Sequence, residues 1–151
     1  MKTFYINPMK VKVPKERMRK DFNPKRMEKL KTSILKIGQI QPIVLTEGNE
    51  LVAGERRLRA CKDLARDVMA IYLKDLKDDP LLQKEMEYAE NVYRDDLSPT
   101  EKILAKDALY RLRREQSPDH RIEDTADEIG ESRSQTTEDI KLACFIKAAP
   151  S

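Results

Sequence analysis

The sequence has no tryptophan, and aromatic residues make up only 5% of its 151 positions. It contains one histidine, His120, for which the sequence offers no catalytic or metal-binding partner. Two cysteines, Cys61 and Cys144, lie far apart and outside any metal-ligand spacing, so we expect reduced thiols that pack as small apolar residues in a reducing cytosol. No apolar run approaches membrane-spanning length, and the N-terminus lacks a signal-peptide pattern.

The sequence is, in contrast, rich in charged residues. Charged residues make up 38% of the chain and hydrophobic residues 39%, with a formal net charge of +3 and a pI near 8.8. The apolar residues recur periodically, which indicates a folded, soluble and helix-rich chain with a thin core rather than a disordered one. Because the net charge is small, any surface that binds nucleic acid must be local.

The stretch Gly54-Glu55-Arg56-Arg57 joins an apolar run, Leu51-Val52-Ala53, to a predicted helix. A glycine at a strand-to-helix turn lets the backbone approach a ligand closely, and the helix N-terminus favours an anion such as phosphate. The two arginines add planar, charged donors that fit phosphate oxygens. An arginine-rich first turn is also common on solvated surfaces, so the tetrapeptide alone leaves both interpretations open.

Before this turn, alternation over residues 9–13 predicts a half-exposed strand that ends at Pro14, followed by a charged loop with Arg17 and Arg19. Asn23 and Pro24 are typical of a helix start, and Gly38 of its end. The pattern then predicts these further elements: a strand at 42–46, a turn at 47–50, a return strand at 51–53, a strand at 68–73 and a helix from Asp79-Pro80 to Glu90-Asn91. Strands alternating with helices favour a small α/β or α+β unit.

The C-terminal part is predicted to be entirely helical. Ser98 to Glu101 forms a capping box with a first-turn proline, and the helix continues to Arg114. Residues 122–129 and 133–143 read as two short helices around Gly130, with Ala126 small enough for a tight crossing, as in a helix-turn-helix. An ordinary helical hairpin is the alternative, and the acidic residues of the first helix count against close phosphate contact there.

The second of these helices is expected to present residues that can hydrogen-bond base edges in a major groove. These candidate DNA-binding residues are Arg133, Ser134, Gln135, Thr136 and Lys141.

Three polar blocks occur in a fixed order: Gly38-Gln39-Ile40-Gln41-Pro42, Gly54 to Arg57, and Glu90-Asn91-Val92-Tyr93-Arg94 followed by Asp96-Leu97-Ser98-Pro99. In order and spacing, from about Arg19 to the C-terminus, they resemble the N-terminal part of the ParB family of chromosome and plasmid partition proteins. The resemblance implies an α+β fold: a small ParB/sulfiredoxin-like nucleotide-binding domain over residues 1–95 and an all-helical helix-turn-helix region over 96–151.

The resemblance also implies a slow CTPase that acts as a DNA clamp in partition or nucleoid organisation, with CTP and Mg²⁺ as ligands. Glu55 and Arg57 would take part in hydrolysis, and Glu90 and Asn91 would serve the metal. The residues implied to bind the nucleotide are Gly38, Gln41, Pro42, Gly54, Glu55, Arg56, Arg57 and Arg94. The implied partners are a palindromic double-stranded DNA site, a second N-terminal domain after nucleotide binding, and a partition ATPase, in a cytoplasmic, nucleoid-associated setting without a membrane.

Two departures from the family bear on this reading. Tyr93 stands where the family usually has Gln, and the chain stops at Ala149-Pro150-Ser151, before the family's remaining central helices and dimerisation domain. We therefore expect a truncated form or a short relative with a different assembly, largely monomeric alone. A sulfiredoxin is rejected because Glu55 occupies the position of its catalytic cysteine.

Two other functions stay open: a nucleotide-dependent small-molecule kinase of the same fold, and a DNA-binding adaptor or transcription regulator whose nucleotide pocket has decayed.

Overall fold

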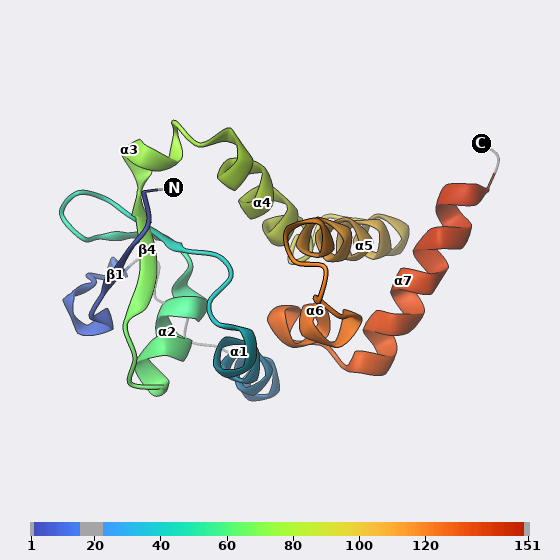
Figure 1. Ribbon diagram of the computed structural model, residues 1–151, viewed down its shortest axis with the longest axis horizontal. Helices are drawn as coiled ribbons and strands as arrows, with labels where there is room; N and C mark the ends of the chain where they lie inside the picture. The colour runs from blue at the N-terminus through green and yellow to red at the C-terminus, as the bar shows by residue number, and fades with distance from the viewer. Residues whose placement is uncertain (1, 16–22, 150–151) are drawn as a thin grey trace. The chain divides into compact units, whose positions relative to one another are not determined.

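The computed structural model describes residues 2–15 and 23–149, and its contacts divide the chain into two compact units, Met1–Gln83 and Lys84–Ser151 (Figure 1). Arg17 and Arg19 lie outside the described residues. None of the helices in the described part of the chain is long and apolar enough to cross a membrane.

The first unit is built on a four-stranded mixed sheet. Its strands are β1 (Phe4–Ile6), β2 (Ile43–Leu45), β3 (Leu51–Ala53) and β4 (Val68–Tyr72), in the order β1-β4-β2-β3. β2 runs parallel to β4 and antiparallel to β3, and Val44 lies opposite both Ala53 and Ile71. The hairpin and β4 occur where the sequence predicted them.

Helices α1 (Pro24–Ile37) and α2 (Glu55–Asp63) complete this unit with the short α3 (Leu73–Leu76). The Asn23 side chain accepts hydrogen bonds from the first-turn N–H groups of Lys25 and Arg26, and Gly38 ends α1, as predicted. Apolar faces of α1 and α2 pack on the sheet to form the core, which includes Met27, Leu30, Ile34, Ile43, Leu45, Leu58, Cys61, Val68 and Ala70.

The N-terminal strand predicted over residues 9–13 is wrong. Pro8–Lys10 forms a 3-10 helix, η1, which Asn7 caps, and only Lys12 bridges to Glu50 of the hairpin. The true edge strand is β1, which pairs antiparallel with β4. Met9, Val11 and Val13 alternate with the two-residue period of a strand. Pro8, however, favours a turn, and the 3-10 helix that follows keeps residues 8–10 from pairing with the sheet.

The second unit is helical, as predicted. It contains the C-terminal part of α4 (Pro80–Asn91), and then α5 (Pro99–Gln116), α6 (Ile122–Ile129) and α7 (Arg133–Ala148). The Ser98 capping box is present, with Ser98 Oγ accepting from Glu101 N at 3.2 Å and Glu101 Oε1 accepting from Ser98 N at 3.1 Å. α7 packs against both α5 and α6.

Contacts place the border between the units inside α4, at Gln83 and Lys84. The domain boundary predicted between residues 95 and 96 was drawn from sequence motifs, so it differs from this border, which is drawn from packing. Glu90, Asn91 and Arg94 therefore belong by packing to the helical unit, although their predicted role lies with the nucleotide.

Candidate nucleotide and DNA sites

Gly54 makes a turn that other residues would strain. It stands between β3 and α2 with φ +102°, in the left-handed region. A Cβ at this position would lie 2.7 Å from Ile43 Cγ2 and 3.1 Å from Ile43 Cα. The glycine is therefore required twice, by its backbone conformation and by its close approach to β2.

Directly after this turn, α2 begins with the predicted anion-binding residues. Glu55, Arg56 and Arg57 form its first turn and are half-buried, while Leu58 is buried in the core and fixes the helix on the sheet. Backbone N–H groups of a first helical turn point out of the helix end, and the helix dipole favours negative charge there. The arrangement suits the oxygens of a phosphate group.

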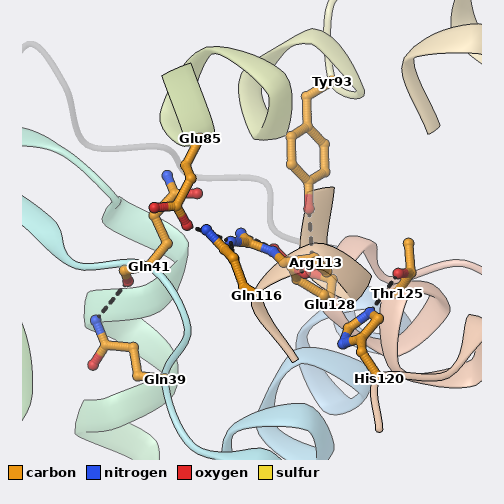
Figure 2. Close-up of polar contacts among 9 residues, drawn as sticks. All are labelled: Gln39, Gln41, Glu85, Tyr93, Arg113, Gln116, His120, Thr125 and Glu128. Atoms are coloured by element: carbon orange, nitrogen blue, oxygen red, sulfur yellow. Dashed lines mark hydrogen bonds and ion pairs between the residues drawn. The ribbon is translucent and has the colours of Figure 1, made fainter. Parts of the chain in front are cut away.

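The side chain of Gln39, for which the sequence predicts no role of its own, fixes the loop from Gly38 to Pro42. The Gln39 amide donates from Nε2 to the carbonyl oxygens of Gln41 and Met69, both at 2.9 Å. Its Oε1 accepts from Met69 N at 2.8 Å, so Gln39 satisfies both backbone groups of one residue of β4. Figure 2 shows the Gln39 amide turned toward the Gln41 backbone. The signal in the sequence is a glutamine directly after the glycine that ends a helix, because a side-chain amide can donate to one backbone carbonyl and accept from a backbone N–H.

Two of the three predicted nucleotide blocks are brought together within the first unit. Ile43, whose backbone Gly54 approaches, follows Pro42 directly, so the Gly38–Pro42 loop ends beside the Gly54–Arg57 turn. Gln41 is 2% exposed, and Pro42 is also buried. The loop and the turn, whose nearest residues Pro42 and Gly54 are 12 positions apart in the sequence, thus meet at the start of β2.

The third block lies in the second unit. Glu90 is exposed and Asn91 half-buried at the end of α4. Arg94 Nη1 donates to Asn91 Oδ1 at 3.4 Å, and Arg94 Nη2 lies 2.8 Å from Asp96 Oδ2, a contact that raises the pKa of the arginine. The approach of Glu90, Asn91 and Arg94 to the Gly54 turn stays a prediction.

Among the described residues, no cluster of three or more His, Cys, Asp or Glu side chains could hold a metal ion by itself. Glu90 and Asn91 offer one carboxylate and one amide oxygen, both hard ligands. Mg²⁺ usually takes one or two protein ligands and completes its shell with water and substrate phosphates. The pair therefore fits an ion that arrives with a nucleotide, and does not form a protein cage.

A buried arginine joins the block that ends α4 to the helix-turn-helix. Arg113 is 1% exposed and donates to both carboxylate oxygens of Glu128 in α6, at 3.2 and 2.8 Å, and to Glu85 in α4 at 2.9 Å (Figure 2). The Tyr93 hydroxyl donates to the Glu128 carbonyl oxygen at 3.3 Å. Tyr93, the departure from the family pattern, thus ties the end of α4 to α6.

Helices α6 and α7 are joined by a three-residue turn with the predicted chemistry. Ala126 is fully buried, and Gly130 ends α6 with φ +74°. Ser132 caps α7 by accepting from Gln135 N at 3.1 Å. The turn and its cap agree with the helix-turn-helix interpretation.

Four of the five predicted DNA-contacting residues are exposed on α7, namely Arg133, Ser134, Gln135 and Lys141. The expected exposure of Thr136 is wrong, because Thr136 is fully buried and its hydroxyl donates to Ser132 O at 3.0 Å. Thr136, Ile140 and Ala143 share the helical spacing of the buried face, so position 136 points into the unit. The candidate DNA-contacting residues are therefore Arg133, Ser134, Gln135 and Lys141.

The acidic residues of α6, which counted against DNA contact, carry internal contacts. Asp124 accepts from Arg121 N at 2.9 Å, Asp127 pairs with Arg133, and Glu128 pairs with Arg113. All three are buried. Asp127 and Glu128 are thus paired with cations inside the unit, which weakens the objection for these two residues.

Comparison with known proteins agrees with this geometry. A family model described as the ParB N-terminal domain matches residues 2–92. A probable chromosome-partitioning protein ParB of Vibrio cholerae is 37% identical over 128 residues, which cover 82% of this chain and 41% of that protein. The chain spans less than half the length of such curated relatives.

Two solved structures are similar over nearly the whole chain. The C-terminally truncated ParB of Caulobacter crescentus complexed to the centromeric parS site is 27% identical with a TM-score of 0.58, covering 98% of this chain and 73% of that one. The same truncated protein complexed with CTP-gamma-S is 28% identical with a TM-score of 0.50, covering 94% and 78%. The α+β fold followed by a helical region is thereby confirmed. Since the family model matches more than half of the residues of this chain, the chain belongs to the ParB N-terminal domain family.

Proposed function

We propose that this chain is a CTP-dependent DNA-binding protein of chromosome or plasmid partition. The observation that carries the proposal is the meeting of the Gly38–Pro42 loop and the Gly54–Arg57 turn in one unit, in a chain that also holds a helix-turn-helix. The first feature suits a triphosphate and the second suits double-stranded DNA.

The nucleotide half of the proposal assigns the phosphates to the turn that Gly54 begins. Gly54 allows the phosphates to approach the backbone, and Arg56 and Arg57 supply charge-assisted donors. Glu90 and Asn91 would hold Mg²⁺ against the phosphates, and Arg94 would reach the phosphates or a partner subunit. These residues do not by themselves indicate which base is bound. The choice of cytosine is supported by the CTP-gamma-S complex of the Caulobacter crescentus relative.

Slow hydrolysis of CTP is the chemical part of the proposal. Transfer of the terminal phosphoryl group to water requires no protein nucleophile, only positioning and compensation of charge. Glu55 would orient the attacking water through its carboxylate, and Arg57 would stabilise the negative charge that develops on the phosphate oxygens. Bound Mg²⁺ would supply further charge compensation at those oxygens.

The DNA half assigns Arg133, Ser134, Gln135 and Lys141 of α7 to a major groove. The parS complex of the Caulobacter crescentus relative supports a specific site, and we propose that this site is palindromic, as the resemblance implies. One copy reads one half-site weakly, and we propose that CTP favours association of two N-terminal domains, which then match both halves. A partition ATPase is the further partner proposed, in a cytoplasmic, nucleoid-associated setting.

Calorimetric titration with CTP, ATP, GTP and UTP, each with Mg²⁺ and with or without duplex DNA, tests the proposal. We expect binding of CTP over the other three nucleotides, and tighter self-association once CTP is bound. Preference for ATP would overturn the cytosine assignment and favour a small-molecule kinase of the same fold. Sequence-specific DNA binding without binding of any nucleotide would favour an adaptor with a decayed pocket.

A further inference from the structure

The two side chains expected to read bases at the start of α7 are each held by an acidic side chain. Arg133 donates from Nη2 to Asp127 Oδ2 at 3.0 Å, and Gln135 donates from Nε2 to Asp139 Oδ1 at 2.9 Å. The Arg133 side chain is 53% exposed, whereas that of Asp127 is 4% exposed. The anchor is therefore buried in the unit while the reading group reaches solvent.

Asp139 is itself held by a lysine of α5. Its second carboxylate oxygen accepts from the ammonium group of Lys106 in α5, whose side chain is 8% exposed. The same ammonium pairs with Glu131 Oε2 at 2.6 Å, in the turn between α6 and α7. A chain of contacts thus runs from the buried face of α5 through Asp139 to the amide of Gln135.

We propose that Asp127 and Asp139 are positioning residues for sequence discrimination, which fix Arg133 and Gln135 in the orientation that meets base edges. This inference rests on the proposed DNA-binding function. Long side chains such as arginine lose rotamer freedom when they bind, and an anchor present before binding removes part of that cost. The Asp127 contact engages one of the five N–H donors of the guanidinium, which is compatible with a two-donor contact to guanine.

The charge of the two acids separates this role from a purely structural one. A carboxylate near DNA repels phosphates, so it opposes sequence-independent binding. Loss of a positioning acid should therefore reduce discrimination between sequences while it leaves non-specific affinity unchanged or raises it. Loss of an acid that only stabilises the fold should weaken binding to all sequences in parallel.

The test uses the full chain and a duplex selected from a randomised pool by the wild type. Affinities of wild type, Asp127→Ala and Asp139→Ala are measured for that duplex, for its single-base-pair variants and for an unrelated duplex. Asp124→Ala is the matched control: its described hydrogen bond goes to Arg121 N and it acts on Arg133 through charge, so it separates loss of the Asp127 hydrogen bond from loss of nearby negative charge. Circular dichroism checks folding, and Asp127→Leu, which has a similar branched shape but no acceptor for Arg133, replaces Asp127→Ala if the latter unfolds.

Asp127→Ala should reduce discrimination at the base pair that Arg133 reads, and Asp139→Ala at the base pair that Gln135 reads. We expect a loss of about 2- to 12-fold in each case, because one long side chain must then be immobilised on binding. Binding to the unrelated duplex should stay within about twofold or increase, and Asp124→Ala should keep the discrimination of the wild type. In an Arg133→Ala background, Asp127→Ala should cause no further loss, because the side chain that it positions is gone.

Unchanged discrimination in both variants, or a parallel loss for all duplexes, would overturn the inference while the proposed function stands. A wild type that selects no sequence from the pool would instead overturn the proposed DNA-binding function, and the inference with it.

Discussion

The two units hold their candidate sites in different ways. In the first unit, the Gly54 turn depends on backbone conformation and on close contact with Ile43 over an apolar core. In the second, the helix-turn-helix is joined to its supporting helices by buried ion pairs, Arg113 with Glu85 and Glu128, and Lys106 with Glu131 and Asp139. A site made of backbone is lost when a side chain is added, and a site held by buried charge is lost when a side chain is removed.

The largest effect should come from the second unit. Arg113→Ala leaves the carboxylates of Glu85 and Glu128 without their shared cation, and breaking such a buried pair costs about 3–5 kcal/mol. Hydrogen exchange followed by mass spectrometry should show lost protection in α5 and α6. The neighbouring exposed Arg114→Ala is the control, expected to have a small effect. An equal loss of protection in α1 and α2 would contradict the separation of the two units.

The reverse experiment adds one methyl group to the first unit. Gly54→Ala combines a left-handed conformation with a clash against Ile43, at about 2–5 kcal/mol in total. Protection in β2, β3 and α2 should fall and nucleotide binding should be lost. Gly48→Ala is the matched control, because its Cβ would meet only Thr46 Oγ1 at 3.8 Å, and it should stay within about 0.5 kcal/mol. A stable Gly54→Ala variant that binds nucleotide normally would refute the close-approach argument.

A third difference between the units appears only at acidic pH. His120 is buried, its Nε2 lies 2.7 Å from Thr125 Oγ1, and burial lowers its pKa from the usual 6.5, while Glu128 and Asp124 oppose the shift. Since the unfolded chain then binds the proton first, stability of the second unit is complete above pH 6.5 and falls as the pH drops through the folded pKa. Denaturant titrations between pH 7 and 5 should show this loss in the wild type, and a shallower one in His120→Gln. Identical pH profiles would exclude His120 as the cause.

Local signals in the sequence predicted most of the architecture. Asn23, Ser98 and Ser132 cap helices as expected, because a cap is decided by residues within one turn. Gly54 was identifiable for the same reason, since a glycine between an apolar strand and a helix marks a special backbone position. The N-terminal strand was misplaced because β1 is defined by pairing with β4, more than 60 residues away.

Contacts between residues far apart in the sequence could not be predicted from local signals. Arg113 and Glu128 are 15 residues apart, Lys106 and Asp139 are 33, and Gln39 and Met69 are 30. In a chain with 38% charged residues, the sequence offers too many possible partners to choose among. Thr136 shows a related limit, since a threonine near a helix start suits either a DNA-facing or a buried position until the face of the helix is known.

A titration of CTP with Mg²⁺ into matched variants asks whether the Gly54 turn with its arginines holds a triphosphate. Arg56→Ala removes a charge-assisted contact and should weaken binding by about 2 kcal/mol or more. Arg59→Ala removes the same charge from the exposed side of α2 and should bind as the wild type does. Equal affinities of Arg56→Ala and Arg59→Ala, or no binding of CTP by the wild type, would show that this turn does not hold the triphosphate.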